Sequence, residues 1–216
     1  MKPKAYYPLF ADLRGRRCVV IGGGLVAQRK VTTLLNYGAD LVVISPAATM
    51  HIRTYARQGR LRYLARRFRP GDLRHAWLAY AATDDMQING QVFRAAQRMR
   101  IFANVVDQTP LCSFIAPAIF RRDPLTIAIS TGGASPSLAK RLRHELEASI
   151  GSDYARMLKL LRSLRGVAKR QLPSYNERKH YFDQLVRGRV FQLVRNGQPQ
   201  AARRTALTML QKAAAN

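Results

Sequence analysis

The sequence of 216 residues is poor in cysteine, histidine and acidic residues, and each shortage argues against a class of function. Its two cysteines, Cys18 and Cys112, lack the spacing of metal ligands, and two isolated thiols do not make a disulfide framework. The four histidines join no His/Cys/Glu cluster, so we expect no permanent metal site. Isolated thiols suit a reducing compartment, and we expect a cytoplasmic protein.

Long apolar runs, internal repeats and low-complexity tracts are also missing. No uninterrupted apolar stretch approaches the roughly 18 residues of a membrane span. The opening MKPKAYYPLF lacks the apolar segment of a signal peptide. From these two absences we expect no membrane partner. The composition is nevertheless 47% hydrophobic, which predicts a folded chain with a substantial core.

Acidic residues are scarce relative to basic ones, with 12 Asp and Glu against 37 Lys and Arg, a formal net charge of +25. Such a field raises the local concentration of anionic partners. The partner class that fits is a nucleic acid, or a small ligand with many carboxylates or phosphates. An evenly spread charge that serves only solubility fits as well, and composition leaves the three open.

What the sequence does contain is an alternation of short β-branched runs and amphipathic stretches over residues 17–106. This pattern predicts βαβ units, a parallel sheet and the class of α/β proteins with a Rossmann-like domain. Gly38 is placed to end the first helix at its C′ position. The expected strands are 17–21, 40–45, 61–65, 78–82 and 101–106, and the expected helices of this part are 25–37 and 85–99.

Beyond Asp107 the pattern changes. SFIAPAIFRR and PLTIAIS predict a small β element, and Ser135 with Pro136 predicts the start of a helix. From residue 152 the spacing of apolar residues predicts helices alone, interrupted at Pro173 and at 197–199. We therefore expect three parts, listed here as a dinucleotide-binding Rossmann domain (1–112), a dimerisation element (113–150) and a helical domain (151–216).

The strongest motif is Gly22-Gly23-Gly24-Leu25-Val26-Ala27, which matches G-x-G-x-x-G/A between a strand and a helix. In this motif Gly22 makes the turn, Gly24 admits a pyrophosphate, and Ala27 lets the helix pack closely on the sheet. The helix N-terminus then offers unpaired N–H groups to the phosphates. The alternative is a phosphate-free relative of the fold.

Three further strand ends are expected to face the same crevice, because ligands of open α/β sheets bind outside the carboxyl ends of the strands. The second strand ends in Ser45-Pro46-Ala47 and lacks the usual carboxylate, so neither NAD nor NADP is excluded on physical grounds. Thr83 would line the nicotinamide site, and Asp107 would enter it from the next strand. Asp84 and Asp85 are alternatively caps of the following helix.

A second glycine turn, STGGASP, precedes the helix that carries Lys140, Arg141 and Arg143. These residues would bind carboxylates of a substrate, or alternatively form a solvated basic face.

Five segments in this order resemble the siroheme synthase family: LFADLRGRRCVVIGGGLVAQRKVTTLL, AATDD, FANVVD, SFIAPAI and ISTGGASPSLAKRLRHELE. The resemblance spans residues 6–150 and continues loosely through the helical part. It implies a homodimer that oxidises precorrin-2 to sirohydrochlorin with NAD, and that often also inserts Fe²⁺ into sirohydrochlorin. Longer members carry a uroporphyrinogen methyltransferase domain. None follows in this sequence, so we expect a separate methyltransferase to supply precorrin-2.

The resemblance also implies roles for individual residues. Asp107 matches the central catalytic aspartate, as proton acceptor or as electrostatic stabiliser. Thr131 falls where relatives carry serine, and we expect it to contact the substrate. The matching backbone positions that hold the dinucleotide are Leu25, Val26, Pro46 and Ala47.

Two rival functions remain at this point. One is a dehydrogenase without chelatase activity. The other is a Rossmann-derived module that binds a tetrapyrrole or nucleic acid without catalysis. The intact NVVD and G-x-G-x-x-A segments argue against the module, and the many carboxylates of precorrin-2 make nucleic acid the less favoured anion.

Overall fold

A computed structural model describes residues 5–215 of the chain, which divide into two compact units, Met1–Ala116 and Pro117–Asn216. Each unit is described by itself. Residues 1–4, which belong to the expected domain 1–112, lie outside the described residues. The further division of the second unit at residue 150 stays a prediction.

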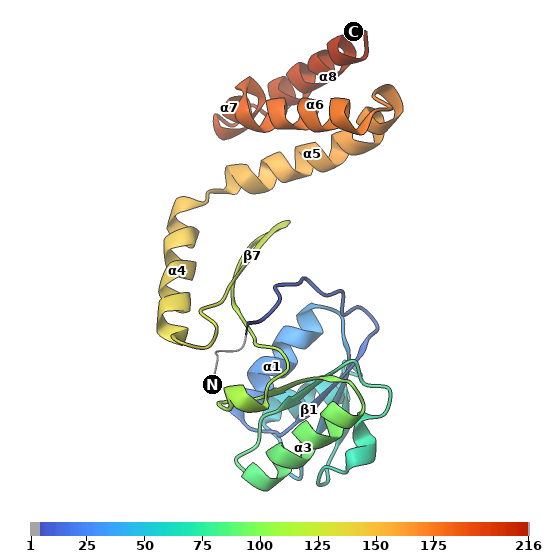
Figure 1. Ribbon diagram of the computed structural model, residues 1–216, viewed down its shortest axis with the longest axis vertical. Coiled ribbons are helices and arrows are strands. Elements are labelled where there is room, and N and C mark those ends of the chain that lie inside the picture. Colours follow the sequence, from blue (N-terminus) through green and yellow to red (C-terminus); the bar gives the residue numbers. More distant parts are fainter. Residues whose placement is uncertain (1–4, 216) are drawn as a thin grey trace. The chain divides into compact units, whose positions relative to one another are not determined.

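The first unit is built on a parallel five-stranded sheet in the order β3-β2-β1-β4-β5, which confirms the expected α/β class (Figure 1). The strands other than the edge strand β3 are rich in β-branched and small apolar residues and are mostly buried on both faces, as parallel strands require. The strands are β1 (Arg17–Ile21), β2 (Asp40–Ile44), β3 (Arg62–Leu64), β4 (Leu78–Ala81) and β5 (Phe102–Val105).

Helices cover both faces of this sheet. One core cluster joins helix α1 (Leu25–Asn36) and helix α2 (Met50–Arg57) to one face, and a second joins α3 (Met86–Arg98) to the other. Figure 1 shows α1 and α3 on opposite sides of the strands. Two short 3₁₀ turns, η1 (Pro70–Leu73) and η2 (Thr109–Leu111), complete the unit.

The end of α1 agrees with its prediction, whereas α2 was missed. Gly38 has a φ of +72° just past the helix, and its N–H donates to the carbonyl of Leu35, so a left-handed residue ends the helix as expected. Helix α2 has only eight residues and follows a loop with proline and alanines, so its apolar residues are too few to show a helical spacing. Its signal was Thr49, whose hydroxyl accepts from the N–H of Ile52 as an N-cap.

The register of the sheet gathers the strand ends. Ile21 of β1 pairs with Ile44 of β2 and with Ala81 of β4, and Ala81 pairs with Val105 of β5. Because these pairings are parallel, the residues that follow four strands emerge at one edge. The loops expected to hold a ligand therefore meet at that edge.

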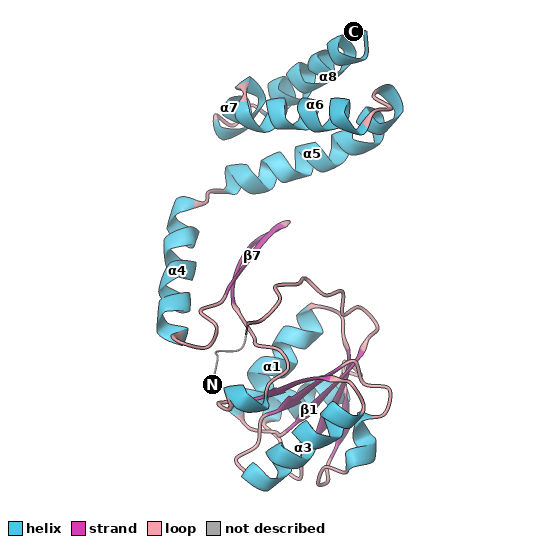
Figure 2. Ribbon diagram, viewed as in Figure 1, coloured by secondary structure: helices cyan, strands magenta, loops and turns pink. Residues whose placement is uncertain are grey.

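The second unit begins with a β-hairpin and continues as helices alone (Figure 2). Strands β6 (Ala118–Arg122) and β7 (Leu125–Ile129) pair in antiparallel fashion, and Ser135 caps the following helix through the N–H of Leu138. The helices are α4 (Pro136–Ser149), α5 (Ser152–Gln171), α6 (Tyr175–Arg187), α7 (Arg189–Arg195) and α8 (Pro199–Ala215).

Helices α5–α8 enclose their own core, and the breaks fall near Pro173 and Gly197 as predicted. Within α6, Tyr181 is buried and donates its hydroxyl to the carbonyl of Ala206, whereas Val186 is 44% exposed. No helix within residues 5–215 has the length and apolar character that crossing a membrane requires.

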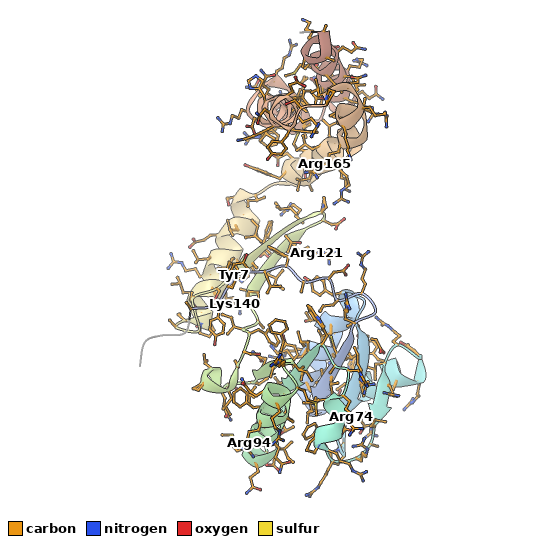
Figure 3. All side chains as sticks on the ribbon, turned by 45° about the vertical axis from the view of Figure 1, so that its right-hand side comes forward. Tyr7, Arg74, Arg94, Arg121, Lys140 and Arg165 are labelled. Atoms are coloured by element: carbon orange, nitrogen blue, oxygen red, sulfur yellow. The ribbon has the colours of Figure 1, made fainter. Side chains whose placement is uncertain are left out.

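Basic side chains are spread over both units rather than gathered on one element. Figure 3 shows Arg74 and Arg94 at the surface of the first unit, and Arg121, Lys140 and Arg165 at the surface of the second. All five residues are exposed. The excess of positive charge is therefore a property of the whole surface.

A half-buried carboxylate ties the connection between β3 and β4 together. Asp72 accepts two hydrogen bonds from the Arg66 guanidinium, at 2.6 and 2.9 Å, and one from the N–H of Arg69 at 2.8 Å. The Arg66 hydrogen bonds, followed by the Arg69 N–H, hold the pKa of Asp72 below its ordinary value against the opposing effect of burial. A depressed folded-state pKa stabilises the fold above the unfolded pKa, and this stabilisation is lost as pH falls.

We predict that Asp72→Asn lowers the free energy of unfolding of the first unit at pH 7 by roughly 1 kcal/mol. The deficit relative to the wild type should shrink below about pH 4, where the wild-type carboxylate becomes protonated. Urea unfolding followed by the fluorescence of Trp77, the single tryptophan, measures the first unit. Asp123→Asn, which removes an exposed carboxylate of the second unit, is the control. A deficit that persists unchanged at pH 3 would contradict the linkage.

Candidate functional site

The turn after β1 passes so close to the loop after β4 that its first residue has no room for a side chain. Gly22 has a φ of +120°, and its N–H donates to the carbonyl of Ile44 at 2.9 Å. A Cβ on Gly22 would lie 2.1 Å from the carbonyl oxygen of Ala82. The turn role expected of Gly22 therefore has two physical causes, the left-handed backbone and this close approach.

The next two glycines of the turn serve different purposes. A Cβ on Gly23 would lie 1.9 Å from the carbonyl oxygen of Ala47, and the Gly23 carbonyl accepts from the N–H of Thr49 at 2.9 Å. Gly23 thus ties the turn to the loop after β2, a requirement that the motif does not include. A Cβ on Gly24 would meet nothing within 4 Å, so space lies open where the motif expects a pyrophosphate.

Helix α1 begins at this open space without a cap from its own chain. Gly24 occupies the N-cap position, no side chain accepts a hydrogen bond there, and the first turn holds no acidic residue. The free N–H groups and the positive end of the helix dipole favour an anion. Leu25 and Val26 are 66% and 40% exposed, whereas Ala27 is fully buried, as close packing of helix on sheet requires. These residues fit the pyrophosphate of a dinucleotide.

The end of β2 lies beside this turn. Ser45 donates its N–H to the carbonyl of Leu64, and its own carbonyl accepts from the Tyr63 hydroxyl at 2.9 Å. Pro46 and Ala47 are exposed. The carboxylate of Asp40 lies at the opposite end of the same strand, so β2 brings no carboxylate to this edge, as the sequence indicates.

Thr83 lies at the end of β4 and uses its hydroxyl within the protein. The hydroxyl accepts from the N–H of Asp85 at 3.1 Å and lies 3.0 Å from Oδ1 of Asn89, while Nδ2 of Asn89 donates to the Thr83 carbonyl. Asp85 caps α3 through the N–H groups of Gln87 and Ile88, which confirms the capping interpretation for this aspartate. The buried Asn89 was missed because an asparagine inside a helix gives no sequence signal.

Asp107 follows β5 with a left-handed backbone, its φ being +58°. Few residues other than glycine adopt this conformation, although Asp and Asn tolerate it best. The side chain is exposed, and within residues 5–215 its carboxylate accepts no hydrogen bond. The carboxyl group of Asp107 is thus at the expected edge with its oxygens available.

Lys30 of α1 is a charged residue of this region that the motifs did not indicate. Its Nζ lies 5.2 Å from the centre of the Tyr80 ring, and the residue is half-buried. Burial lowers the pKa of Lys30, and the negative charge of Asp107 acts against this by raising it. The signal in the sequence was a lysine on the face of α1 near the buried Ala27 and Val31, where an apolar residue would be ordinary.

The remaining expected site residues belong to the second unit. The Thr131 hydroxyl donates to the carbonyl of Ser135 and accepts from its N–H, so it closes the STGGASP turn. Lys140 and Arg141 share one face of α4, where Arg141 pairs with Glu145 at 2.8 Å.

Arg143 lies on another face of α4 and pairs with Glu147. Lys140 makes no ion pair within the described part of the chain. The three basic residues therefore do not form one cluster, and within residues 5–215 no three metal-ligating side chains gather.

The contrast between neighbouring glycines gives a prediction. Gly23→Ala should destabilise the first unit by roughly 2–3 kcal/mol, because the added carbon meets a backbone carbonyl that cannot move aside. Gly24→Val should cost only about 1 kcal/mol of stability, as a poorer N-cap with a φ of −77° that suits any residue, but should weaken dinucleotide binding at least about tenfold. Thermal unfolding and titration calorimetry measure the two effects. A folded Gly24→Val variant with wild-type affinity would remove the pyrophosphate from this turn.

Three family models match the chain in sequence. The model described as "Putative NAD(P)-binding" matches residues 9–118, the sirohaem biosynthesis protein central model matches 122–149, and the sirohaem synthase dimerisation region matches 153–210. The model named for dimerisation therefore matches helices α5–α8. From the sequence we expect dimerisation through residues 113–150, and that assignment stays a prediction.

Curated relatives and a solved structure agree with these models. Siroheme synthase 1 of Serratia proteamaculans is 39% identical over 92% of this chain and 42% of that protein, and siroheme synthase 2 of Cronobacter sakazakii is 41% identical over 95% and 45%. The chain thus spans less than half the length of the curated relatives it matches. The structure of SirC, a precorrin-2 dehydrogenase, superposes with a TM-score of 0.75 at 25% identity, covering 96% of this chain and all of SirC. The glycine turn, the order of the three models and these relatives show that the chain belongs to the siroheme synthase family, in the region that begins with its NAD(P)-binding domain.

Proposed function

We propose that the chain is an NAD-dependent dehydrogenase that oxidises precorrin-2 to sirohydrochlorin. The observation that carries this proposal is an anion-binding turn, open above Gly24, at the same sheet edge as the exposed carboxylate of Asp107. The likeness to SirC supports precorrin-2 as the substrate. A non-catalytic binding module is disfavoured, because binding alone does not require a carboxylate in a left-handed backbone beside the turn.

The protein's part in this reaction is to bind, to orient and to receive a proton. The backbone of Gly22, Gly24, Leu25 and Val26 would hold the pyrophosphate, and the Ser45–Ala47 segment would hold the adenosine end. Thr83, fixed by Asp85 and Asn89, would form a rigid wall of the nicotinamide site. When bound, the dinucleotide supplies the hydride acceptor.

Oxidation of precorrin-2 also releases a proton, and Asp107 is the group that we assign to it. A general base must be ionised and free to approach the proton that it abstracts. The Asp107 carboxylate accepts no hydrogen bond within residues 5–215, so its oxygens are available. The backbone of β5 and of the left-handed turn fixes its direction.

Lys30 is the positioning residue that we assign beside Asp107. Its half-buried stem and its contact with the Tyr80 ring hold the ammonium group in place. Burial has the largest effect on the pKa of Lys30 and lowers it, while the charge of Asp107 raises it and that of Arg29 lowers it. Lys30 thus brings a positive charge to the region of the Asp107 carboxylate.

The expected substrate-binding residues of the second unit belong to the same proposal. Thr131, Lys140, Arg141 and Arg143 would meet carboxylates of precorrin-2 and of sirohydrochlorin, with Arg141 and Arg143 partly neutralised by their glutamates. Insertion of Fe²⁺ into sirohydrochlorin, as the alternative to a pure dehydrogenase, is tested by continuing the same reaction with Fe²⁺ under anaerobic conditions.

The proposal also covers the oligomeric state, the cellular compartment and the source of the substrate. The match to a dimerisation region supports a homodimer. Both cysteines are buried free thiols, which suits the cytoplasm. A separate uroporphyrinogen methyltransferase would supply precorrin-2.

The decisive assay follows nicotinamide reduction after precorrin-2 and NAD⁺ are added to the protein. Asp107→Asn should lower kcat at least about a hundredfold and leave NAD⁺ affinity within about twofold, because the amide cannot accept the proton and does not touch the dinucleotide phosphates. Asp40→Asn is the matched control, since it removes an exposed carboxylate at the opposite end of the same sheet. Wild-type turnover in the Asp107 variant would remove Asp107 from the mechanism, and no reduction by the wild type would refute the dehydrogenase.

Lys30→Met should lower kcat/KM about tenfold at pH 7, because the site would lose the positive charge near Asp107. Lys30→Arg keeps the charge and should restore most of the rate. Arg29→Met, which removes the adjacent exposed cation, is the control. A folded Lys30→Arg variant as slow as Lys30→Met would show that the lysine has only a packing role.

A further inference from the structure

The turn that carries Asp107 has a strained backbone for a residue other than glycine. Asp107 has a φ of +58°, and a left-handed conformation of this kind costs free energy in any residue with a Cβ. Such a conformation persists only where the surrounding structure holds it. The contacts that hold this turn therefore also set the direction of the Asp107 carboxylate.

The chain on either side closes the base of the loop over residues 106–112. The N–H of Ser113 donates to the carbonyl of Ala103 at 2.8 Å, and the Ala103 N–H donates to the Ser113 hydroxyl at 2.7 Å. Within the loop, the 3₁₀ turn η2 folds the chain back, and the N–H of Cys112 donates to the carbonyl of Thr109 at 3.1 Å. These bonds return the chain to β5 and bring Cys112 close to the turn that it follows.

The side chain of Cys112 joins the two arms of this turn. The residue is 4% exposed, and its Sγ lies 3.3 Å from the carbonyl oxygens of both Val105 and Gln108. These two carbonyls stand two residues before Asp107 and one residue after it. The single thiol proton can be donated to either carbonyl or shared between them. Cys112 therefore bridges the backbone on both sides of Asp107.

A second sulfur contact of the turn is open to solvent. The side-chain amide of Gln108 donates to Sδ of Met86, and Met86 is 64% exposed. Water competes for a contact of this kind, whereas the buried contacts of Cys112 are shielded from water. The thiol of Cys112 is therefore the sulfur that holds the turn in place.

The loop can lose this thiol and still satisfy its backbone. The Val105 carbonyl also accepts from the N–H of Gln108 at 3.2 Å, and the Gln108 carbonyl also accepts from the N–H of Leu111 at 2.9 Å. Removal of the thiol thus leaves neither carbonyl unpaired. We expect a variant without the thiol to fold, with a turn that is held less firmly.

We propose that Cys112 is a positioning residue, whose thiol holds the Asp107 turn in the orientation that receives the proton of precorrin-2. This inference rests on the proposed function. Because the thiol is buried, it acts through Asp107 rather than by contact with the substrate. A displacement of a catalytic group by about 1 Å can lower a rate by as much as about a hundredfold.

Steady-state kinetics of the full chain with precorrin-2 and NAD⁺ tests this role. Cys112→Ala should lower kcat about tenfold and leave the KM for NAD⁺ within about twofold, because the Asp107 turn shifts while the pyrophosphate turn does not. Cys112→Ser restores a hydrogen-bond donor and should bring kcat back to within about threefold of the wild type. A wild-type kcat in a folded Cys112→Ala variant would overturn the positioning role.

Cys18→Ala is the matched control. Cys18 is the other buried thiol of the first unit, and it lies in register with Leu78 and Phe102, at the other end of the sheet from Asp107. Its thiol donates no hydrogen bond within residues 5–215. This variant should keep kcat within about twofold even where its unfolding temperature falls as much as that of Cys112→Ala. An equal loss of kcat in both variants would show a general effect of core packing and contradict the proposal.

A double-mutant cycle tests whether Cys112 acts through Asp107. In the Asp107→Asn background, Cys112→Ala should change the residual kcat less than about twofold, because no carboxylate is left to orient. A further loss of about tenfold in that background would place the effect of the thiol elsewhere and overturn the proposal.

Hydrogen exchange measured by mass spectrometry follows the turn without turnover. The N–H groups of Gln108 and Leu111 should exchange at least about fivefold faster in Cys112→Ala than in the wild type, and at the wild-type rate in Cys18→Ala. A wild type that does not reduce NAD⁺ refutes the dehydrogenase, while faster exchange in Cys112→Ala alone still shows that the thiol holds the turn. An active wild type with unchanged exchange in Cys112→Ala refutes the positioning role and leaves the dehydrogenase intact.

Discussion

The first unit depends on one close approach, in which the turn after β1 is held between the loops that follow β2 and β4. The carbonyls of Ala82 and Ala47 occupy the places where side chains of Gly22 and Gly23 would be. Because the sheet is parallel, these loops emerge together, and the glycines let them close up over the sheet edge. The N-terminus of α1 and the end of β2 are positioned by this arrangement.

The sequence indicated this edge well, because its signals are local and periodic. The β-branched runs, the glycine motif and the Ser135-Pro136 start each depend on neighbours along the chain, and the structure has the corresponding elements. What could not be predicted depends on contacts between distant segments. Gly23 is required by Ala47, Asn89 holds the Thr83 turn, and Lys30 lies over the Tyr80 ring, and none of these pairs is visible in a linear pattern.

The arginines of the protein fall into two groups, those that pair with a carboxylate and those that do not. Arg66 is bound to Asp72 and stabilises a connection, and Arg141 and Arg143 have glutamates one turn away. Arg53 and Arg57 have no such partner within residues 5–215 and face a cavity. A net charge of +25 counts all of them alike, which is why composition alone did not separate solubility from recognition.

The missing cap of α1 would couple the proposed ligand to folding. Helices α2 and α3 satisfy their first N–H groups internally, through Thr49 and Asp85. Helix α1 has no such side chain, so under the proposed function a bound pyrophosphate would take the place of an N-cap. By mass action, a rising concentration of dinucleotide would then make the unfolding of this unit less frequent.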